Sequence, residues 1–370
     1  MTAVTVTGWS VLTSAGAGAA VLAGALRGRA PAGRGDVVTD MYPEPLPEPR
    51  AHVLTDFDVR ARLGRKGTGS YDRATALAVV CCQDALHEAG TIVDDATRAR
   101  VGVALGTSLG SFKSTSDYSR ETLVAERPYQ VNPLLFPNTV MNGAAGQVAI
   151  RFGLRAVNAT IAGGPLAFLN AVRYAANAID RGYADVMLTG AAEEFSPHRA
   201  WASHLTGATT AVASGEGAAV FVLAADGGPP EWAGTRRAAR VLSVATGFGP
   251  DGAESVDEAL AGCVARALAG AYAYPGEVSA VLTGEAGEDD LAEYGPAVRA
   301  LGHRPERITT KALFGECDAA SPAMGLGALL ASGRLGAARD GLCLVTARGP
   351  DGAVGAALVE GAADAGADRR

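Results

Sequence analysis

The sequence predicts a protein of the α/β class. Of the 370 residues, 48% are apolar and 48 are glycines, a composition typical of a compact chain with a sizeable core and many tight turns. Residues 158–190 follow the pattern strand, glycine turn, buried helix, strand. Strand-like and helix-like segments alternate along the rest of the chain in two stretches of similar order. We therefore expect one fold made of two similar halves.

The net charge and the cysteine content of the sequence exclude several classes of function. The formal net charge is −7 and no block of Lys and Arg occurs, which argues against a nucleic-acid partner. An acidic carrier protein would need a local basic patch on such a chain. The N-terminus lacks the pattern of a signal peptide, and no apolar run approaches the roughly 18 residues of a membrane span, so we expect a cytoplasmic protein with no membrane partner. The five cysteines lack an even number and CxxC spacing, so we expect neither disulfides nor a metal site.

The first half is expected to open with a strand at 4–8 and a helix of small residues at 15–26. Five prolines between positions 30 and 60 predict a surface loop there. A helix is predicted at 72–89, because apolar side chains recur at helical spacing and a glycine follows. The apolar run 101–108 is typical of a strand in a sheet that is covered on both faces.

The second half repeats this order after a boundary at residues 226–236, where glycines and prolines gather. We expect domains at 1–226 and 237–370. The predicted strands of the second half are 240–244, 278–283, 342–346 and 353–359, and its predicted helices are 255–272, 291–301 and 320–335.

The segment 158–185 is predicted to place a turn before a buried helix. Gly163 and Gly164 loosen the turn, and Pro165 suits a first helical position, where its missing N–H costs nothing. Apolar side chains then recur at helical spacing, at Leu166, Leu169, Val172, Ala176 and Ile179. Such a turn often holds a nucleophile, because helix N-terminal amides stabilise negative charge. Here it contains neither Cys nor Ser.

This segment resembles the nucleophile elbow of the beta-ketoacyl synthases, condensing enzymes of the thiolase superfamily. The run 101–108, the Phe136-Pro137-Asn138-Thr139 motif with the helix after it, and the run 214–223 resemble the same family. The resemblance implies a thiolase-like five-layer αβαβα fold made of two similar halves, with the elbow at 160–166. It also implies that the region of Phe136, Asn138 and Asn142 builds a subunit interface; ordinary turn chemistry is the alternative for the two asparagines.

The family uses one Cys and two His for decarboxylative condensation, and the resemblance implies that this chain has none of them. Counting back from the Gly-x-Ala-Asp element places Pro165 at the nucleophile position, whereas aligning the Ala-Gly-Gly triplet gives Ile161 or Ala162. No His stands near Leu282, where the first is expected. Glu316 takes the place of the second, although Lys311 is retained. A carboxylate there would repel an enolate. We expect no catalytic residue.

A chain that lacks all three groups but keeps the scaffold resembles the chain length factors, which are also called ketosynthase beta subunits. The resemblance implies a heterodimer with an active ketosynthase alpha subunit in a type II polyketide synthase. It implies no cofactor of this chain's own, since the partner works with a phosphopantetheine-bearing acyl carrier protein. The helix after residue 110 would line the acyl tunnel through Phe112, Thr115 and Tyr118. Ordinary packing on an amphipathic helix is the alternative for these three.

Two other functions stay open at this point. A divergent thiolase-fold enzyme could act on acyl thioesters without a Cys nucleophile, using Lys311, Glu316 or one of three acids, Glu285, Asp289 and Asp290. An ion pair between Lys311 and Glu316 would be the simpler interpretation if both were buried. A homodimeric scaffold without a synthase partner is the third hypothesis. The five histidines are isolated in the sequence, so we expect surface or capping roles for His52, His87, His198, His204 and His303.

Overall fold

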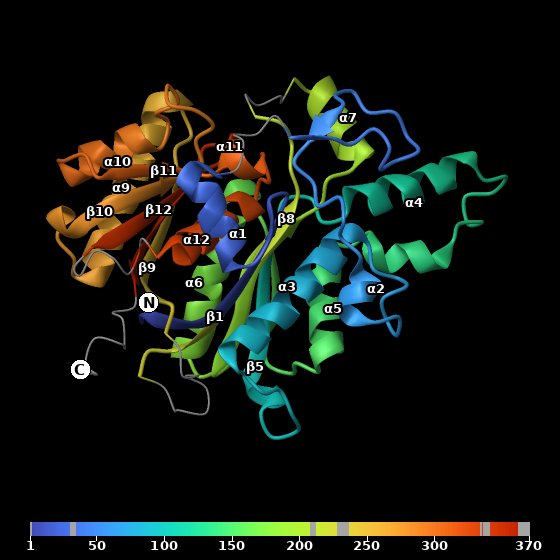
Figure 1. Cartoon of the computed structure of the whole chain (residues 1–370), viewed down its shortest axis with the longest axis horizontal. Coiled ribbons are helices and arrows are strands. Elements are labelled where there is room, and N and C mark those ends of the chain that lie inside the picture. The colour runs from blue at the N-terminus through green and yellow to red at the C-terminus, as the bar shows by residue number, and fades with distance from the viewer. Residues whose placement is uncertain are drawn as a thin grey trace.

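The computed structural model of the chain describes residues 2–29, 35–207, 212–227, 237–333, 335 and 341–361. Two sheets alternate with three layers of helices (Figure 1). One outer layer holds α3 (Arg73–Ala89) and α5 (Gly143–Phe152), and the other holds α9 (Gly252–Ala271) and α10 (Tyr294–Leu301). Between the sheets lie α6 (Ala167–Asp180) and α12 (Ala320–Ser332). This layered α/β arrangement confirms the predicted fold class.

The sheet of the first half has the strand order β6-β5-β7-β8-β1. Its central strand β5 pairs in parallel with both neighbours, whereas β8 pairs antiparallel with both of its own. The strands are β1 (Val4–Thr13), β5 (Val101–Thr107), β6 (Asn158–Ala162), β7 (Val186–Glu193) and β8 (Gly217–Ala225).

The sheet of the second half repeats that order as β11-β10-β12-β13-β9, with the same parallel and antiparallel pairings. Its strands are β9 (Ala239–Phe248), β10 (Val278–Thr283), β11 (Glu306–Thr309), β12 (Leu342–Arg348) and β13 (Ala353–Gly361). Antiparallel pairing of β1 with β9 joins the sheets of the two halves into one continuous sheet. The chain is thus built of two similar halves. The predicted boundary at 226–236 lies mostly outside the described residues.

Three apolar clusters lie between the five layers, because the strands bury both faces. In β7, Val186 and Leu188 face α3 and α5, whereas Met187 faces the central helices. Strands β7 and β8 approach closely at Gly190, where a Cβ atom would lie 1.9 Å from the carbonyl oxygen of Ala219. Only glycine fits at this position.

Several short elements differ from the sequence expectation. The predicted helix at 15–26 is instead β2 (Gly16–Ala17), α1 (Ala19–Gly24) and the π-helical turn η1 (Ala25–Arg29). The proline-rich segment is more than a surface loop: β3 (Asp36–Val37) pairs with β4 (Arg50–Ala51), and Val38 and Val53 are buried against Phe195. The remaining elements are α2 (Val59–Leu63), η2 (Arg98–Arg100), α4 (Phe112–Val124), η3 (Pro133–Asn138), η4 (Gly164–Leu166), α7 (Pro197–Leu205), η5 (Pro275–Glu277) and α11 (Lys311–Phe314).

Helix α4 projects from the right side of Figure 1, beside η3 and α7. The structure describes every residue of α4, and none of them is buried. In the described part of the chain, no helix combines the length and apolar character needed to cross a membrane.

Candidate functional site

The elbow forms as predicted, with β6 leading through Gly163 into η4 and α6. Pro165 stands in the first turn of η4, where it leaves no amide unpaired. Ile161 and Ala162 are the last residues of β6, and Ala162 is exposed. The elbow thus presents a helix N-terminus, and the three candidate positions Ile161, Ala162 and Pro165 carry only aliphatic side chains, so none of them can attack a thioester.

At the second expected histidine position, Glu316 forms an ion pair with Lys311, and both side chains are largely buried. The other carboxylate oxygen of Glu316 accepts hydrogen bonds from the backbone N–H of Asp318, at 3.0 Å, and from the hydroxyl of Ser321, at 3.3 Å. Both oxygens of this carboxylate are therefore already engaged by protein donors. The adjacent Cys317 is fully buried, and burial raises the pKa of its thiol well above the ordinary value, which keeps it protonated.

At the first expected histidine position, Leu282 is a buried residue of β10. Glu285, just after that strand, is buried and pairs with Arg307 while accepting the backbone N–H groups of Glu293 and Tyr294. Glu293 accepts the backbone N–H of Gly284 at 3.0 Å and the hydroxyl of Thr346 at 2.6 Å, and burial raises its pKa. The carboxylates of Glu285 and Glu293 thus hold the loop between β10 and α10 in place.

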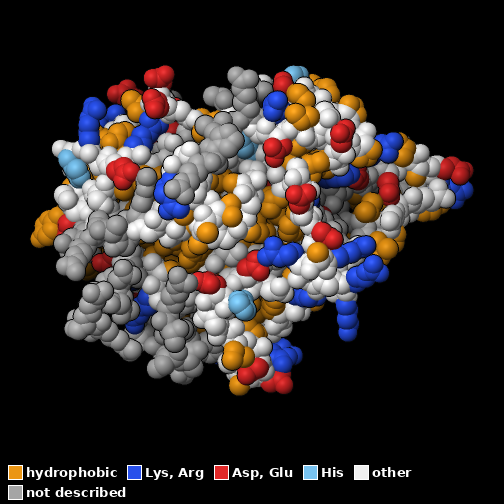
Figure 2. Space-filling model, viewed as in Figure 1, with side chains coloured by type: hydrophobic (Ala, Val, Ile, Leu, Met, Phe, Trp, Pro, Cys, Tyr) orange, Lys and Arg blue, Asp and Glu red, His pale blue; other side chains and the backbone are white. Residues whose placement is uncertain are grey.

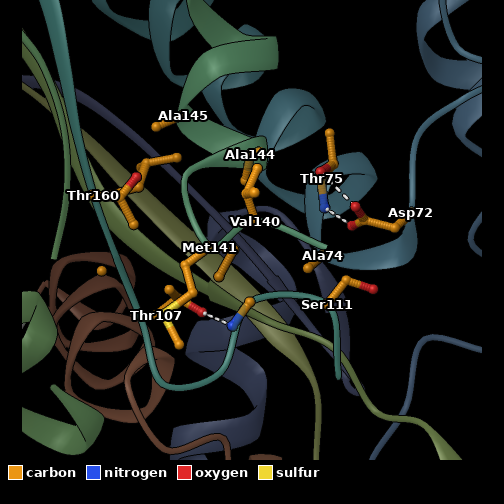
Figure 3. Close-up of a pocket in the computed structure, with 15 residues that line it drawn as sticks. Asp72, Ala74, Thr75, Thr107, Ser111, Val140, Met141, Ala144, Ala145 and Thr160 are labelled. Atoms are coloured by element: carbon orange, nitrogen blue, oxygen red, sulfur yellow. Dashed lines mark hydrogen bonds between the residues drawn. The ribbon is translucent and has the colours of Figure 1, made fainter. Parts of the chain in front are cut away.

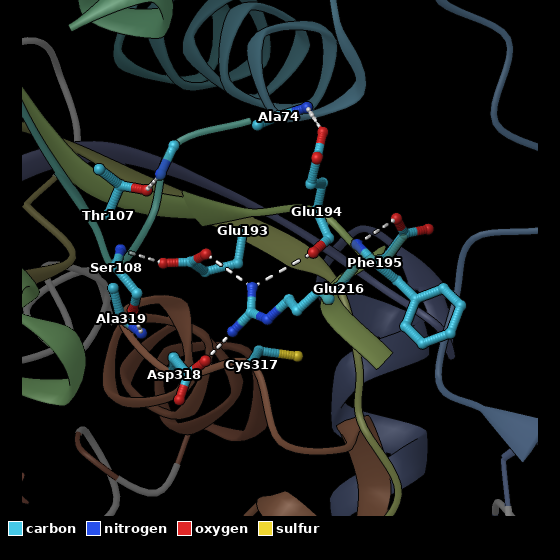
Figure 4. A network of polar contacts seen from close by, with 12 residues as sticks. Ala74, Thr107, Ser108, Glu193, Glu194, Phe195, Glu216, Cys317, Asp318 and Ala319 are labelled. Carbon is cyan, nitrogen blue, oxygen red and sulfur yellow. Dashed lines mark hydrogen bonds and ion pairs between the residues drawn. The ribbon is translucent and has the colours of Figure 1, made fainter. Parts of the chain in front are cut away.

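A buried ionic network joins the two halves, because Glu193 and Asp318, both labelled in Figure 4, pair with the same side chain, that of Arg199. Nη1 of Arg199 lies 2.8 Å from the carboxylate of Glu193 at the end of β7, and its other terminal nitrogen pairs with Asp318 just before α12. Glu193, which is fully buried, also accepts the backbone N–H of Ser108 at 2.5 Å. Sequence analysis missed Arg199. The available signal was the acidic pair Glu193-Glu194 directly after a buried strand, since buried carboxylates need a cation.

A second buried carboxylate, Glu216, holds the start of α3 against the sheet. Its oxygens accept hydrogen bonds from Nε of Arg73 at 2.6 Å, from the terminal Nη2 of Arg73 at 2.5 Å, and from two backbone N–H groups, those of Leu54 and Phe195. Glu216 is fully buried. In the described part of the chain, the buried carboxylates Glu193 and Glu216 thus form ion pairs and hydrogen bonds that hold elements of the fold together.

Of the three predicted tunnel residues, Phe112 faces α7, whereas Thr115 and Tyr118 face η3 and the residue after it. Phe112 lines an open groove between α4 and α7, together with Trp201 and Leu205. The hydroxyl of Thr115 donates to the carbonyl oxygen of Ser111 at 3.0 Å, and the ring of Tyr118 packs on Phe136 with 5.9 Å between centroids. Their role in a tunnel stays a prediction.

A small inner cavity opens between α3, β5 and the residues that follow η3 (Figure 3). Its water-accessible volume is about 20 Å³, room for a single water molecule. Asp72, Ser111, Met141 and Thr160 are among the residues that line it. Because Met141 is 45% exposed and Thr160 belongs to the edge strand β6, the cavity lies close to the molecular surface.

The predicted interface residues are near that surface. Phe136 is 56% exposed, Asn138 donates from Nδ2 to the carbonyl oxygen of Ser70 at 2.8 Å, and Asn142 precedes α5 without a capping bond from its side chain. Large apolar side chains are exposed in the segment 134–150 that holds these residues, and we call this set the apolar face: Leu134, Phe136, Val140, Met141 and Ile150.

The histidines divide between surface and interior. The expectation of a surface role is wrong for His52, which is buried because its segment pairs with Gly215. His303 approaches the carbonyl oxygen of Val278 at 2.9 Å, His198 lies 3.4 Å from Asp117, and His204 stacks edge-on against Trp201. His87 stands in the last turn of α3, where a cation suits the helix dipole.

Comparison with known proteins adds independent findings. The family model of the beta-ketoacyl synthase N-terminal domain matches residues 2–227. The 3-oxoacyl-[acyl-carrier-protein] synthase 2 of Staphylococcus aureus (strain N315) is 28% identical over 165 residues, 45% of this chain and 40% of that protein. The Vibrio cholerae protein of the same name is 30% identical over 146 residues, 40% of this chain and 35% of its own length. The chain therefore spans well under two thirds of the curated relatives it matches.

Solved structures match over nearly the whole chain. The ishigamide ketosynthase/chain length factor is 31% identical with a TM-score of 0.82, covering 98% of this chain and 99% of that one. A beta-ketoacyl synthase from Burkholderia phymatum STM815 has a TM-score of 0.84 at 21% identity, over 98% of this chain and 100% of that one. A type II polyketide synthase ketosynthase in complex with its acyl-carrier protein has a TM-score of 0.79 at 20% identity, with the same coverage. The last two likenesses concern the fold alone.

Proposed function

Since the chain belongs to the beta-ketoacyl synthase family, we propose that it is a non-catalytic subunit, a chain length factor, that pairs with an active ketosynthase in a type II polyketide synthase. The observation that carries this proposal is the elbow, which keeps its backbone but has only aliphatic side chains at Ile161, Ala162 and Pro165. Condensation needs a thiolate to carry the acyl group and donors to stabilise the enolate. A partner must supply both.

The apolar face supports pairing with a partner of the same fold. Helix α5, which carries Ile150 of this face, packs beside β6, the strand that ends the sheet of the first half, and an edge strand presents backbone donors and acceptors on its free side. Large exposed apolar side chains that gather in one segment are typical of a protein interface. The inner cavity opens at the same place, so a partner bound there would cover it and extend it. We propose that this cavity becomes part of the acyl tunnel in the heterodimer.

The alternative of a Cys-independent enzyme finds no support in the geometry. Glu316 is bound to Lys311 and Glu285 to Arg307, which leaves neither carboxylate free to act as a base. Asp290 accepts two backbone N–H groups of its own turn.

Co-expression with a ketosynthase alpha subunit tests the proposal. Size-exclusion chromatography with mass analysis should give a one-to-one heterodimer. In that heterodimer, Met141→Ala should lengthen the main product because it enlarges the cavity, and Ala144→Leu should shorten it because the larger side chain fills the cavity. Ser119→Ala, an exposed position on α4, is the matched control and should leave the product unchanged. A homodimer that turns over an acyl thioester without any ketosynthase would contradict the proposal.

We also propose that an acidic, phosphopantetheine-bearing carrier protein docks at a basic cluster on α2 and the loop after it. This cluster consists of exposed residues on a chain of net charge −7, and basic side chains gather over α2 in Figure 2. Its members are Arg60, Arg62, Arg65 and Lys66. Arg151 fixes the loop by donating to the carbonyl oxygens of Leu63, at 2.7 Å, and Lys66, at 3.0 Å.

Reversing two charges of the cluster should weaken carrier binding. We expect the double variant Arg65→Glu/Lys66→Glu to raise the Kd of the heterodimer for its carrier protein by about 5-fold at low salt, on the basis of roughly 1 kcal/mol for a pair of exposed charge contacts. Added salt should reduce the difference. Arg181→Glu/Arg304→Glu changes the net charge equally at exposed sites elsewhere and serves as control. Equal losses in both double variants, measured by titration calorimetry, would exclude docking at the cluster.

A further inference from the structure

The inner cavity between α3 and β5 is lined mostly by apolar side chains and glycines, but one of its polar groups is unpaired (Figure 3). The hydroxyl oxygen of Thr160 is buried and has no hydrogen-bond partner in the described part of the chain. The other polar side chains of the lining are those of Asp72, Thr75, Thr107 and Ser111. Taking a hydroxyl out of water without a new hydrogen bond is costly, so buried hydroxyls in folded proteins are usually paired with the protein or with an ordered water.

Three of the other polar side chains are engaged by protein groups. Asp72 accepts the backbone N–H of Thr75 at 2.7 Å and its hydroxyl at 3.1 Å (Figure 3). The hydroxyl of Ser111 lies 3.2 Å from both carboxylate oxygens of the buried Glu194, which also accept backbone N–H groups at the beginnings of α3 and α4. These three side chains therefore have other partners than Thr160.

Thr107 still has a proton to donate, and it stands on the same face of the sheet as Thr160. Its oxygen accepts the backbone N–H of Gly110 at 3.0 Å, but in the described part of the chain its hydroxyl proton has no acceptor. Parallel pairing of β5 with β6 sets Leu105 opposite Thr160 and Thr107 opposite Ala162. Side chains two residues apart on a strand point to the same face, so the hydroxyls of Thr107 and Thr160 both reach the cavity from this face.

We propose that the inner cavity binds one water molecule, which accepts the free proton of Thr107 and forms a hydrogen bond with the hydroxyl of Thr160. The cavity volume of about 20 Å³ suits a single water. A bound water needs at least two polar partners, and the two hydroxyls supply them. None of the described residues that line the cavity is basic, so the site has nothing to balance an anion and takes a neutral oxygen.

This water joins two segments beside the elbow. Thr160 directly precedes Ile161 in β6, which is the edge strand of the sheet. Thr107 ends β5 and fixes the turn at Gly110, from which the chain enters α4. The water therefore holds the elbow strand to the turn before α4. The proposal goes beyond the function proposed above and does not depend on it.

The sign of a stability change tests the proposal in the full chain. Thr160→Val keeps the shape of the side chain but takes a partner from the water, so we expect the equilibrium constant of unfolding, measured in urea, to rise about 5-fold. Thr189 is the matched control, because its hydroxyl is also buried without a partner in the described part of the chain but lines neither the inner cavity nor the groove beside α4. Thr189→Val removes an unpaired hydroxyl, so its unfolding constant should fall about 10-fold.

Crystal structures of the full chain provide a second, independent measurement. Wild type and Thr160→Ser, which keeps a hydroxyl, should both show one ordered water at about 3 Å from the oxygen of residue 160 and from that of Thr107. Thr160→Val should show none there. A Thr160→Val chain that is as stable as wild type, or more stable, would overturn the proposal. A wild-type crystal structure without an ordered water in the cavity would do the same, and it decides the question even if Thr160→Val does not fold.

Discussion

Replacing Arg199 by alanine should lower the free energy of unfolding by about 3–5 kcal/mol. The substitution removes the cation that pairs with the fully buried Glu193 and with Asp318, and an unpaired buried carboxylate loses far more in desolvation than it regains elsewhere. Most of the loss should come from Glu193, since the side chain of Asp318 is 37% exposed and water can solvate it. Urea unfolding at constant pH measures the effect.

Two controls separate the lost ion pair from lost packing. Arg181→Ala truncates an exposed arginine and should cost less than about 0.5 kcal/mol. Arg199→Met combined with Glu193→Gln replaces the charges with neutral groups of similar volume, and should recover much of the stability because no buried charge is left unpaired. If Arg199→Ala unfolds at the same urea concentration as Arg181→Ala, the network does not hold the two halves together.

Replacing Gly190 by alanine should be at least as damaging, with a loss of about 4 kcal/mol or more. The added Cβ would meet the carbonyl oxygen of Ala219 at 1.9 Å and the Cα of Val220 at 2.8 Å. Both are backbone atoms of β8, so the clash can be relieved only by separating β7 from β8 in the middle of the sheet. We expect poor soluble expression, with a large fall in Tm for any protein recovered.

Gly146→Ala is a control for which we expect the free energy of unfolding to rise and not to fall. It lies within α5, and a Cβ added there meets no atom within 4 Å. Gly146→Ala should raise the free energy of unfolding by about 0.5–1 kcal/mol, because alanine loses less conformational entropy in a helix. Similar Tm values for the two variants would show that strand separation at Gly190 is not the limiting contact.

The sequence predicted the longer elements well where one periodic pattern dominated. The helix at 72–89 corresponds to α3, with Asp72 as its N-cap and Gly90 in the left-handed conformation at its end. The buried strands β5 and β7 were visible as apolar runs. Short elements were missed. An element of four to nine residues, such as β11, α11 or α7, contains too few repeats of the hydrophobic pattern to be recognised in the sequence. The segment 30–60 was misjudged because its prolines concealed Val38 and Val53, which pack against Phe195, 157 and 142 positions away in the sequence.

The candidate site likewise has features that the sequence predicts and features that only the tertiary structure reveals. The sequence by itself determined what chemistry is missing: no nucleophile stands in the elbow, and Glu316 replaces an expected imidazole, because the identity of a side chain needs no coordinates. Only the tertiary structure decided what the remaining charges do. Arg199 meets Asp318, Glu216 meets Arg73, and Glu194 spans two helices, across separations of 119, 143 and up to 120 residues. Whether a buried carboxylate is a base, an ion-pair partner or a helix clasp depends on its neighbours in space, and chain folding brings those neighbours together.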